Sequence, residues 1–288
     1  MVLNSYAKLN LYLSVLSKRK DNYHNIKTLF ERIDLCDRIN LKVLPEKEIK
    51  IICNDPLVPK GPTNLCFRAA KLLQDKFKIR QGAEIKIIKR IPVGAGLGGG
   101  SGNAACVLLG LNKLWKLRLS RKRLASLAKK IGADVAFFIY DVSFAWAEER
   151  GDKIRPLTAL EKVKLWHILV VPKLHVSTPL IYRNWDKLSG LTMRPPDVKI
   201  LISRLKDKSR EIRAELLFNS LEQVTTKLYP EAERAKSALK KLGLKSILMS
   251  GSGPAVFGIV SSKKEAESSS RKLRNLERSW RIFVARTF

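Results

Sequence analysis

The sequence has few of the residues that build metal centres, and its four cysteines form no recognisable pair. Cys36, Cys53, Cys66 and Cys106 are widely spaced, no CxxC is present, and the 288 residues include three histidines. Zinc sites and disulfide frameworks need closely spaced cysteines or Cys–His clusters. This scarcity argues against both, and it predicts reduced, mostly buried thiols and no metal-ligating cluster.

Long apolar runs are also missing. No apolar stretch approaches the roughly 18 residues of a membrane-spanning helix. Residues 1–20 place their basic side chains after the apolar ones, which is the reverse of a signal peptide. These absences predict a cytoplasmic chain without membrane contact. Apolar residues still make up 45% of the sequence, enough for a substantial core, so general disorder is not expected.

Acidic residues are scarce beside basic ones: 26 Asp and Glu accompany 56 Lys and Arg, a formal net charge of +30. Such a charge attracts nucleotides, nucleic acids or acidic membranes. The basic residues are nevertheless spread over the whole chain, with neither a concentrated stripe nor the aromatic platform of RNA-binding modules. Solvated basic faces are the favoured interpretation. A non-catalytic RNA-binding protein stays open as an alternative of a different class.

Hydrophobic periodicity predicts strands interspersed with helices in both halves of the chain. Strands are expected at 8–16, 39–44, 49–53, 84–89, 166–171, 246–249, 255–260 and 281–285. Helices are expected from Thr63 to Phe77, after the glycine-rich segment, from Ser120 to Gly132, and at 178–187, 216–242 and 263–274. This alternation favours an α+β fold with two lobes.

The most informative segment is residues 92–105, PVGAGLGGGSGNAA, in which six glycines fall between positions 94 and 102. Glycine permits positive φ and lets a ligand approach the backbone. Successive N–H groups beside a helix N-terminus form an anion site, so the segment predicts a polyphosphate loop and an ATP-dependent kinase. The absence of lysine excludes a Walker A loop, and no clear βαβ unit supports a Rossmann fingerprint.

This loop resembles that of the GHMP kinases, the family of galactose, homoserine, mevalonate and phosphomevalonate kinases. The likeness runs nearly end to end, through AKLN (7–10), DNYH (21–24), TLF (28–30), GADV (132–135), TP (178–179), FNSLE (218–222) and MSGSGP (249–254). The form GLGGGSxNAA is most similar to the branch that phosphorylates a CDP-linked methylerythritol. Together these motifs are highly specific.

The resemblance implies an N-terminal α+β lobe with a ribosomal-protein-like β-α fold over residues 1–157. A ferredoxin-like lobe would follow over residues 158–288, with the active site between the lobes. The implied reaction uses ATP and Mg²⁺ to phosphorylate the 2-hydroxyl of CDP-methylerythritol, in the non-mevalonate route to isoprenoid precursors. The implied partners are this small molecule and ATP, without nucleic acid, and the protein would be a monomer or weak homodimer. Another GHMP kinase, acting on homoserine or mevalonate, stays open.

Asp134 is the candidate general base, because phosphoryl transfer needs a group that takes the hydroxyl proton. The residues alone leave a structural turn aspartate equally open, and the resemblance favours catalysis. Lys8 is expected beside Asp134, where a cation keeps the carboxylate ionised and steadies charge on the attacking oxygen. Asn10 projects from the same strand face and is expected to hydrogen-bond the substrate.

The resemblance also assigns two groups of binding residues. Tyr23, His24, Thr178 and Tyr182 would bind the substrate, since aromatic rings stack on a pyrimidine. The ATP site would comprise Asn64 near the adenine, Lys89 before the loop, and the loop residues Pro92, Gly94, Gly96, Leu97, Gly98, Gly99, Gly100, Ser101, Gly102 and Asn103. The turn at 250–253 is expected to face the site.

Three positions depart from the usual pattern of the family. Gly102 replaces a second serine in the loop, Ala136 replaces a proline, and Glu149 replaces a glycine. Gly102 is expected to remove a hydroxyl from the phosphate site. The departures bear on loop rigidity and turnover more than on the class of reaction.

Overall fold

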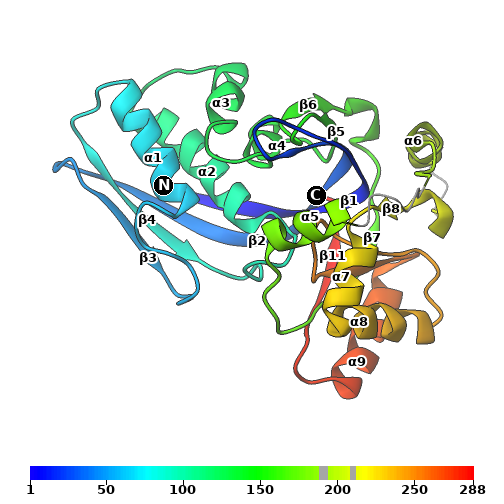
Figure 1. Cartoon of the computed structure of the whole chain (residues 1–288). Helices are drawn as coiled ribbons and strands as arrows, with labels where there is room; N and C mark the ends of the chain where they lie inside the picture. The colour runs from blue at the N-terminus through cyan, green and yellow to red at the C-terminus, as the bar shows by residue number, and fades with distance from the viewer. Residues whose placement is uncertain (188–193, 208–211) are drawn as a thin grey trace.

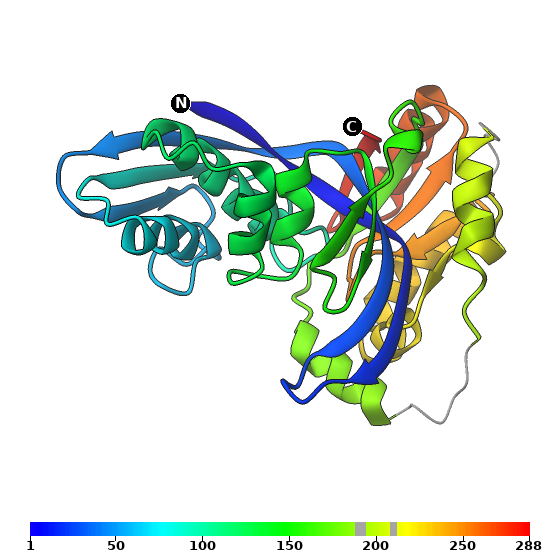
Figure 2. The ribbon, with the colours of Figure 1, turned by 90° about the horizontal axis from the view of Figure 1, so that it is seen from above.

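Two long antiparallel strands, β1 (Val2–Lys18) and β2 (His24–Leu44), run through most of the molecule. The computed structural model describes residues 1–187, 194–207 and 212–288. Figure 2 shows this β1–β2 ribbon in blue, passing from the N-terminal sheet to the end of helix α5 (Thr178–Lys187). Its residues join all three apolar clusters: Ile39 lies in one, Leu9 in the second and Leu13 in the third. The ribbon therefore connects both lobes.

The N-terminal sheet has seven strands in the order β3-β4-β2-β1-β8, with β5 paired to β2 and β6 to β5. The further strands are β3 (Ile49–Cys53), β4 (Gly82–Ile88), β5 (Phe144–Glu148), β6 (Lys153–Pro156) and β8 (Phe218–Asn219). The accompanying helices are α1 (Leu65–Lys76), α2 (Gly99–Leu114), α3 (Arg121–Ala128) and α4 (Val135–Tyr140). Helices α1 and α2 lie against one face of the sheet (Figure 1), because each has an apolar stripe that the strands bury.

The second sheet has the order β11-β7-β10-β9, and every neighbouring pair is antiparallel. Its strands are β7 (Trp166–Val171), β9 (Ile247–Met249), β10 (Val256–Val260) and β11 (Arg281–Arg286). Its helices are α7 (Glu222–Leu228), α8 (Pro230–Lys241) and α9 (Lys263–Leu276), while α6 (Val198–Lys206) lies apart from them (Figure 1). Strand, helices, two strands, helix and strand make the ferredoxin-like βαββαβ arrangement. The predicted α+β, two-lobed fold is confirmed.

The lobes also share strand pairing. β8 belongs to the C-terminal half of the sequence but pairs in parallel with β1, through Tyr12–Phe218 and Leu13–Asn219. Ser220 extends this contact by accepting a hydrogen bond from the Val15 N–H at 3.0 Å. An isolated bridge joins Ile33 on β2 to Thr287. Backbone hydrogen bonds therefore cross between the lobes at both of these places, and the Ala255 N–H also donates to the Ala95 carbonyl at 3.3 Å.

Several predicted elements needed correction. The helix predicted over 216–242 is wrong, because it contains β8 and two helices separated at Pro230, which cannot donate the backbone hydrogen bond needed to continue α7. The helix beginning after Ser120 ends at Ala128 rather than Gly132. Helix α1 is capped by Asn64 and not opened by Thr63, since the Asn64 side chain accepts the Cys66 N–H at 2.7 Å.

Two of the departures from the family pattern have a local explanation. Glu149 has φ +61°, a left-handed conformation that strains any residue with a Cβ and suits the usual glycine. Ala136 lies in the first turn of α4, where proline is tolerated and alanine equally fits a helix. Across the described ranges, no helix is long and apolar enough to cross a membrane.

Candidate active site

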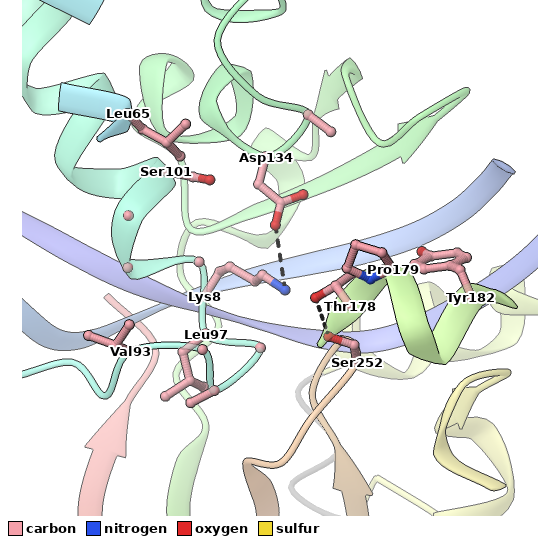
Figure 3. A pocket seen from close by; sticks show the side chains of 18 of the residues that line it. Lys8, Leu65, Val93, Leu97, Ser101, Asp134, Thr178, Pro179, Tyr182 and Ser252 are labelled. Carbon is pink, nitrogen blue, oxygen red and sulfur yellow. Dashed lines mark hydrogen bonds and ion pairs between the residues drawn. The ribbon is translucent and has the colours of Figure 1, made fainter. Parts of the chain in front are cut away.

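A cavity of about 910 Å³ lies between the lobes, a size typical of small-molecule sites. It is lined by β1, the glycine loop, the residues before α4, the start of α5 and the 250–253 turn (Figure 3). The predicted site residues that line it are Lys8, Asn10, Tyr23, His24, Asn64, Lys89, Pro92, Gly94, Gly96, Leu97, Gly98, Gly99, Gly100, Ser101, Asn103, Asp134, Thr178 and Tyr182. Gly102 does not.

The glycine loop is held in a conformation that side chains cannot follow. Gly94, Gly96 and Gly98 have φ of +68°, +74° and +68°, so every second residue is left-handed. A Cβ on Gly96 would lie 2.1 Å from the Ser250 carbonyl oxygen. The Leu97 carbonyl accepts the Lys8 N–H at 3.0 Å, which fixes the loop to β1. The glycines are therefore required by both backbone conformation and close packing.

Helix α2 begins directly after this loop and directs its N-terminus towards the cavity. Its N-cap residue, Gly98, has no side chain to accept the first N–H groups, and its first turn contains no acidic residue. Ser101 projects from this turn towards the space in front of Asp134 (Figure 3). The Oδ1 atom of Asn103 is buried without a hydrogen-bond partner in the described part of the chain. Free N–H groups and a positive helix end are the features that the sequence predicted for an anion site, and phosphate binding here stays a prediction.

The structure corrects the prediction for Gly102. Its N–H donates to the Gly98 carbonyl at 2.9 Å, so it is used within the helix. A Cβ on Gly102 would lie 2.7 Å from the Tyr6 carbonyl oxygen and 2.9 Å from Ser5 Oγ. The residue thus faces β1, and its lack of a hydroxyl removes nothing from the cavity. Spacing along the loop did not reveal this, because residues 101 and 102 lie on different faces of α2.

Lys8 and Asp134 meet in the middle of the cavity. Lys8 Nζ lies 3.8 Å from Asp134 Oδ2, as the dashed line in Figure 3 marks. Lys8 is only 3% exposed, whereas the Asp134 side chain is 31% exposed. Asp134 is the N-cap residue of α4, yet its carboxylate caps no N–H group of that helix in the described structure. It therefore remains available to a ligand in the cavity.

Asn10 orients the Lys8 ammonium. Asn10 Oδ1 accepts a hydrogen bond from Lys8 Nζ, and Asn10 Nδ2 donates to Thr28 Oγ1 at 2.8 Å. Thr28 Oγ1 in turn donates to the Tyr12 carbonyl at 2.7 Å. This chain holds the ammonium near Asp134. The contact between Asn10 and substrate stays a prediction.

Burial lowers the pKa of Lys8, and the Asp134 carboxylate opposes this only in part. The ammonium therefore deprotonates at lower pH than the ordinary value of 10.5. We expect kcat to decline with rising pH around a midpoint below 10.5, because neutral Lys8 cannot steady the charge of the reacting oxygen. Because the folded chain releases this proton more easily than the unfolded chain, the same shift favours folding more as pH rises.

The measurement is kcat at saturating substrates between about pH 7 and 10.5, with circular dichroism confirming that the protein stays folded. Lys8→Arg is the control, since arginine remains charged over this range and its residual activity should lack the alkaline decline. A wild-type kcat that stays constant across the range would contradict this role.

The other end of the cavity is aromatic. His24 Nε2 hydrogen-bonds Asp186 Oδ1 at 2.6 Å, and Lys18 Nζ contacts Asp186 Oδ2 at 2.7 Å. The His24 ring stacks on Tyr182, with centroids 5.1 Å apart and planes 23° apart, and Trp185 meets it edge-on at 5.6 Å. Burial raises the pKa of Tyr182, with a smaller contribution from Asp134. The Tyr182 hydroxyl is therefore a neutral donor at physiological pH.

Tyr23 is placed differently from His24. It is 56% exposed, and the Arg150 guanidinium lies over its ring at 5.3 Å. Tyr23 and Tyr182 both line the cavity, but it is His24 that stacks on Tyr182. The sequence reasoning missed Trp185 and Asp186. Their spacing from Tyr182, three and four residues further along α5, was the available signal.

Asn64 and Lys89 have structural partners that the sequence did not reveal. Asn64 Nδ2 donates to the Pro59 carbonyl at 2.6 Å while its Oδ1 caps α1. Lys89 Nζ donates to Asp37 Oδ2 at 2.6 Å. Asp37 was not among the predicted site residues. Both Asn64 and Lys89 still line the cavity, and their contacts with ATP stay predictions.

The 250–253 turn packs on the glycine loop, and its residues Gly251 and Ser252 line the cavity that the turn was expected to face. Ser250 Oγ donates to the Gly96 carbonyl at 3.0 Å, and Ser252 Oγ lies 2.8 Å from Thr178 Oγ1 (Figure 3). Asn219 Nδ2 donates to the Gly251 carbonyl at 2.8 Å. The FNSLE motif therefore supports this turn from behind. None of the described His, Cys, Asp and Glu side chains gather in groups of three able to hold a metal.

Comparison with known proteins agrees with this geometry. The N-terminal domain of GHMP kinases matches residues 64–141, and their C-terminal domain matches residues 200–278. The 4-diphosphocytidyl-2-C-methyl-D-erythritol kinase of Geobacillus kaustophilus (strain HTA426) is 46% identical over 255 residues, 88% of this chain and 86% of that protein. The protein of the same name from Bacillus subtilis (strain 168) is 43% identical over 254 residues, 88% of this chain and 86% of its own length.

Solved structures agree with these domain and sequence matches. A crystal structure of 4-(cytidine 5'-diphospho)-2C-methyl-D-erythritol kinase has a TM-score of 0.79 and 33% identity, covering 99% of this chain and 98% of that one. Homoserine kinase from Cytophaga hutchinsonii has a TM-score of 0.73 at 18% identity, covering 100% of this chain and 94% of that one, which shows a shared fold alone. With both domains matched and relatives above 40% identity over most of its length, the chain belongs to the GHMP kinase family.

Proposed function

We propose that the protein transfers the γ-phosphoryl group of ATP to the 2-hydroxyl of CDP-methylerythritol, giving the 2-phosphate and ADP in the non-mevalonate route to isoprenoid precursors. The observation that carries the proposal is the order of features along one cavity. The glycine loop and the α2 N-terminus lie at one end, Lys8 and Asp134 in the middle, and the His24–Tyr182 stack at the other. The close relatives bear the name of this activity.

In the proposed reaction, Asp134 accepts the proton of the substrate hydroxyl as its oxygen attacks the γ-phosphorus. The bond from that phosphorus to the β,γ-bridging oxygen breaks, and ADP leaves with the electron pair. Lys8 steadies the negative charge on the attacking oxygen, while the loop N–H groups and the α2 N-terminus stabilise the phosphates. Asn10 keeps the Lys8 ammonium in place.

The oxygen atoms around the α2 N-terminus fit a magnesium ion held mainly by ATP. Mg²⁺ keeps several waters and binds one or two carboxylates together with substrate phosphates. Ser101 and Asp134 offer a hydroxyl and a carboxylate that line the same space. When bound, Mg²⁺ would neutralise charge on the phosphates.

The aromatic end would bind the cytidine. Asp186 fixes the His24 ring, so that a pyrimidine meets a prearranged surface formed with Tyr182. Thr178 and Tyr23 would complete this pocket. In this proposal residues 1–157 supply the ATP site, and residues 158–288 form the wall of the cavity that faces it. The protein would be a cytoplasmic monomer or weak homodimer without nucleic-acid or membrane partners.

The test is a coupled assay of ADP release with purified protein, ATP and Mg²⁺. We expect ADP release to depend on CDP-methylerythritol and to stay near background with homoserine, mevalonate or no acceptor. Equal ATP consumption with and without CDP-methylerythritol would refute the assignment. Preference for homoserine or mevalonate would favour another GHMP activity, and tight, salt-sensitive RNA binding without turnover would favour the non-catalytic alternative.

A further inference from the structure

A fully buried carboxylate lies behind the glycine loop. Asp37 on β2 is 0% exposed. Its Oδ1 accepts the backbone N–H groups of Arg90 and Ile91, each at 2.8 Å, and its Oδ2 accepts Lys89 Nζ at 2.6 Å. One side chain thus binds three successive residues, immediately before the loop begins at Pro92.

Lys89 connects this carboxylate to the start of α2. Its ammonium also donates to the Ile91 carbonyl at 2.7 Å. A Cβ on Gly99 would lie 3.0 Å from Lys89 Nζ, so the ammonium rests against the first turn of the helix. The pair therefore contacts both flanks of the loop: residues 89–91, directly before it, and Gly99, where the helix begins.

The Asp37 carboxylate and the Lys89 ammonium each need the opposite charge of the other at this position. A cation beside a helix N-terminus is unfavourable by itself. A buried carboxylate is costly unless donors satisfy it, and removing one partner of such a pair leaves the other charge uncompensated. Asp37 balances the Lys89 ammonium and is in turn satisfied by it. Lys89 is thus not a freely available cation, and its position depends on Asp37.

We propose that Asp37 is a positioning residue for ATP. It fixes Lys89 and residues 89–91 so that the loop N–H groups and the α2 N-terminus converge on the phosphates. Asp37 is not among the residues that line the cavity, so it acts through the residues it holds. The inference rests on the proposed function, in which the loop binds ATP.

Two mechanisms make opposite predictions for Asp37→Asn. If Asp37 positions the loop, losing one acceptor should raise the KM for ATP and the Kd of a non-hydrolysable ATP analogue about 10-fold or more. The KM for CDP-methylerythritol should change less than about 2-fold. If Asp37 only masks the charge of Lys89, the variant should bind the analogue more tightly, and the proposal is overturned. An unchanged Kd overturns it as well.

Lys89→Met and the double variant, Asp37→Asn with Lys89→Met, test whether the two residues act as one unit or independently. The single Lys89→Met change should also weaken analogue binding, because Asp37 Oδ2 loses its partner. The double variant should bind no more weakly than the worse single variant, because the two residues act as one unit. Additive losses would show that they act independently. Lys89→Met also keeps the proposal testable if Asp37→Asn does not fold.

Asp34→Asn is the matched control. Asp34 is on the same strand, its side chain is 40% exposed, and the substitution changes net charge by the same amount. Its Kd for the analogue should equal that of the wild type. Binding of the analogue by the wild-type protein is measured first: if it is absent, the proposed function fails. Normal wild-type binding with an unaffected Asp37→Asn variant refutes only the positioning role.

Discussion

Asp134→Asn should lower kcat about 10²–10⁴-fold, the range that general acid–base catalysis contributes. The asparagine keeps the shape of the side chain but cannot take the hydroxyl proton. Because Asp134 makes no capping hydrogen bond within the described structure, α4 should survive the change. The KM for ATP should change little, since the loop binds the phosphates. Steady-state kinetics with both substrates checks this prediction.

Asp75→Asn serves as the comparison for this change. Asp75 is an exposed carboxylate on α1 that forms an i,i+4 ion pair with Lys71, so its loss should leave kcat unaltered. Circular dichroism and thermal unfolding should show both variants folded. An Asp134→Asn variant with near wild-type kcat would show that another group takes the proton.

Gly96→Ala should damage both the fold and the activity. The added Cβ would lie 2.1 Å from the Ser250 carbonyl oxygen, at a residue with φ +74°. Backbone strain and overpacking each cost about 1–3 kcal/mol, so we expect unfolding free energy to fall by about 3 kcal/mol or more. The loop and the 250–253 turn would separate. Turnover should then fall with stability, measured by denaturant unfolding and ADP release.

Gly100→Ala is the comparison, from the same cluster of glycines. It is helical, and its Cβ would meet only Leu65 Cδ1, at an ordinary 3.8 Å. Its stability should be unchanged or higher by up to about 1 kcal/mol, because alanine favours a helix. Equal stability of the two variants would mean that Gly96 is not constrained as the structure indicates.

The sequence predicted the parts of the site whose residues lie close together in the chain. Six glycines before an amphipathic helix indicate a phosphate loop by backbone chemistry alone, and the family motifs added Lys8 and Asp134. The ferredoxin-like lobe was implied by the family resemblance, whereas local periodicity indicated its four strands, β7, β9, β10 and β11.

Other features depend on contacts between distant segments. Asp37 meets Lys89 across 52 positions, and His24 meets Asp186 across 162. Nothing in the local pattern around Asp37 indicates such a partner, and for Asp186 the signal was its spacing of four residues from Tyr182. The beginning of β2 was missed because residues 26 to 33 are buried on both faces apart from Lys27, which removes the alternation that identifies a strand. Gly102 was misassigned because sequence does not show which side of α2 faces β1.

The pairing of β1 with β8 also affects how the chain folds during its synthesis. β1 is translated early, yet its neighbour at Ser220 lies 205 residues further along. A nascent chain on the ribosome must therefore carry one unpaired strand edge until the second lobe emerges, and such edges invite association between chains. Completion of the N-terminal sheet waits for the C-terminal half, so the last steps of folding follow synthesis of most of the polypeptide.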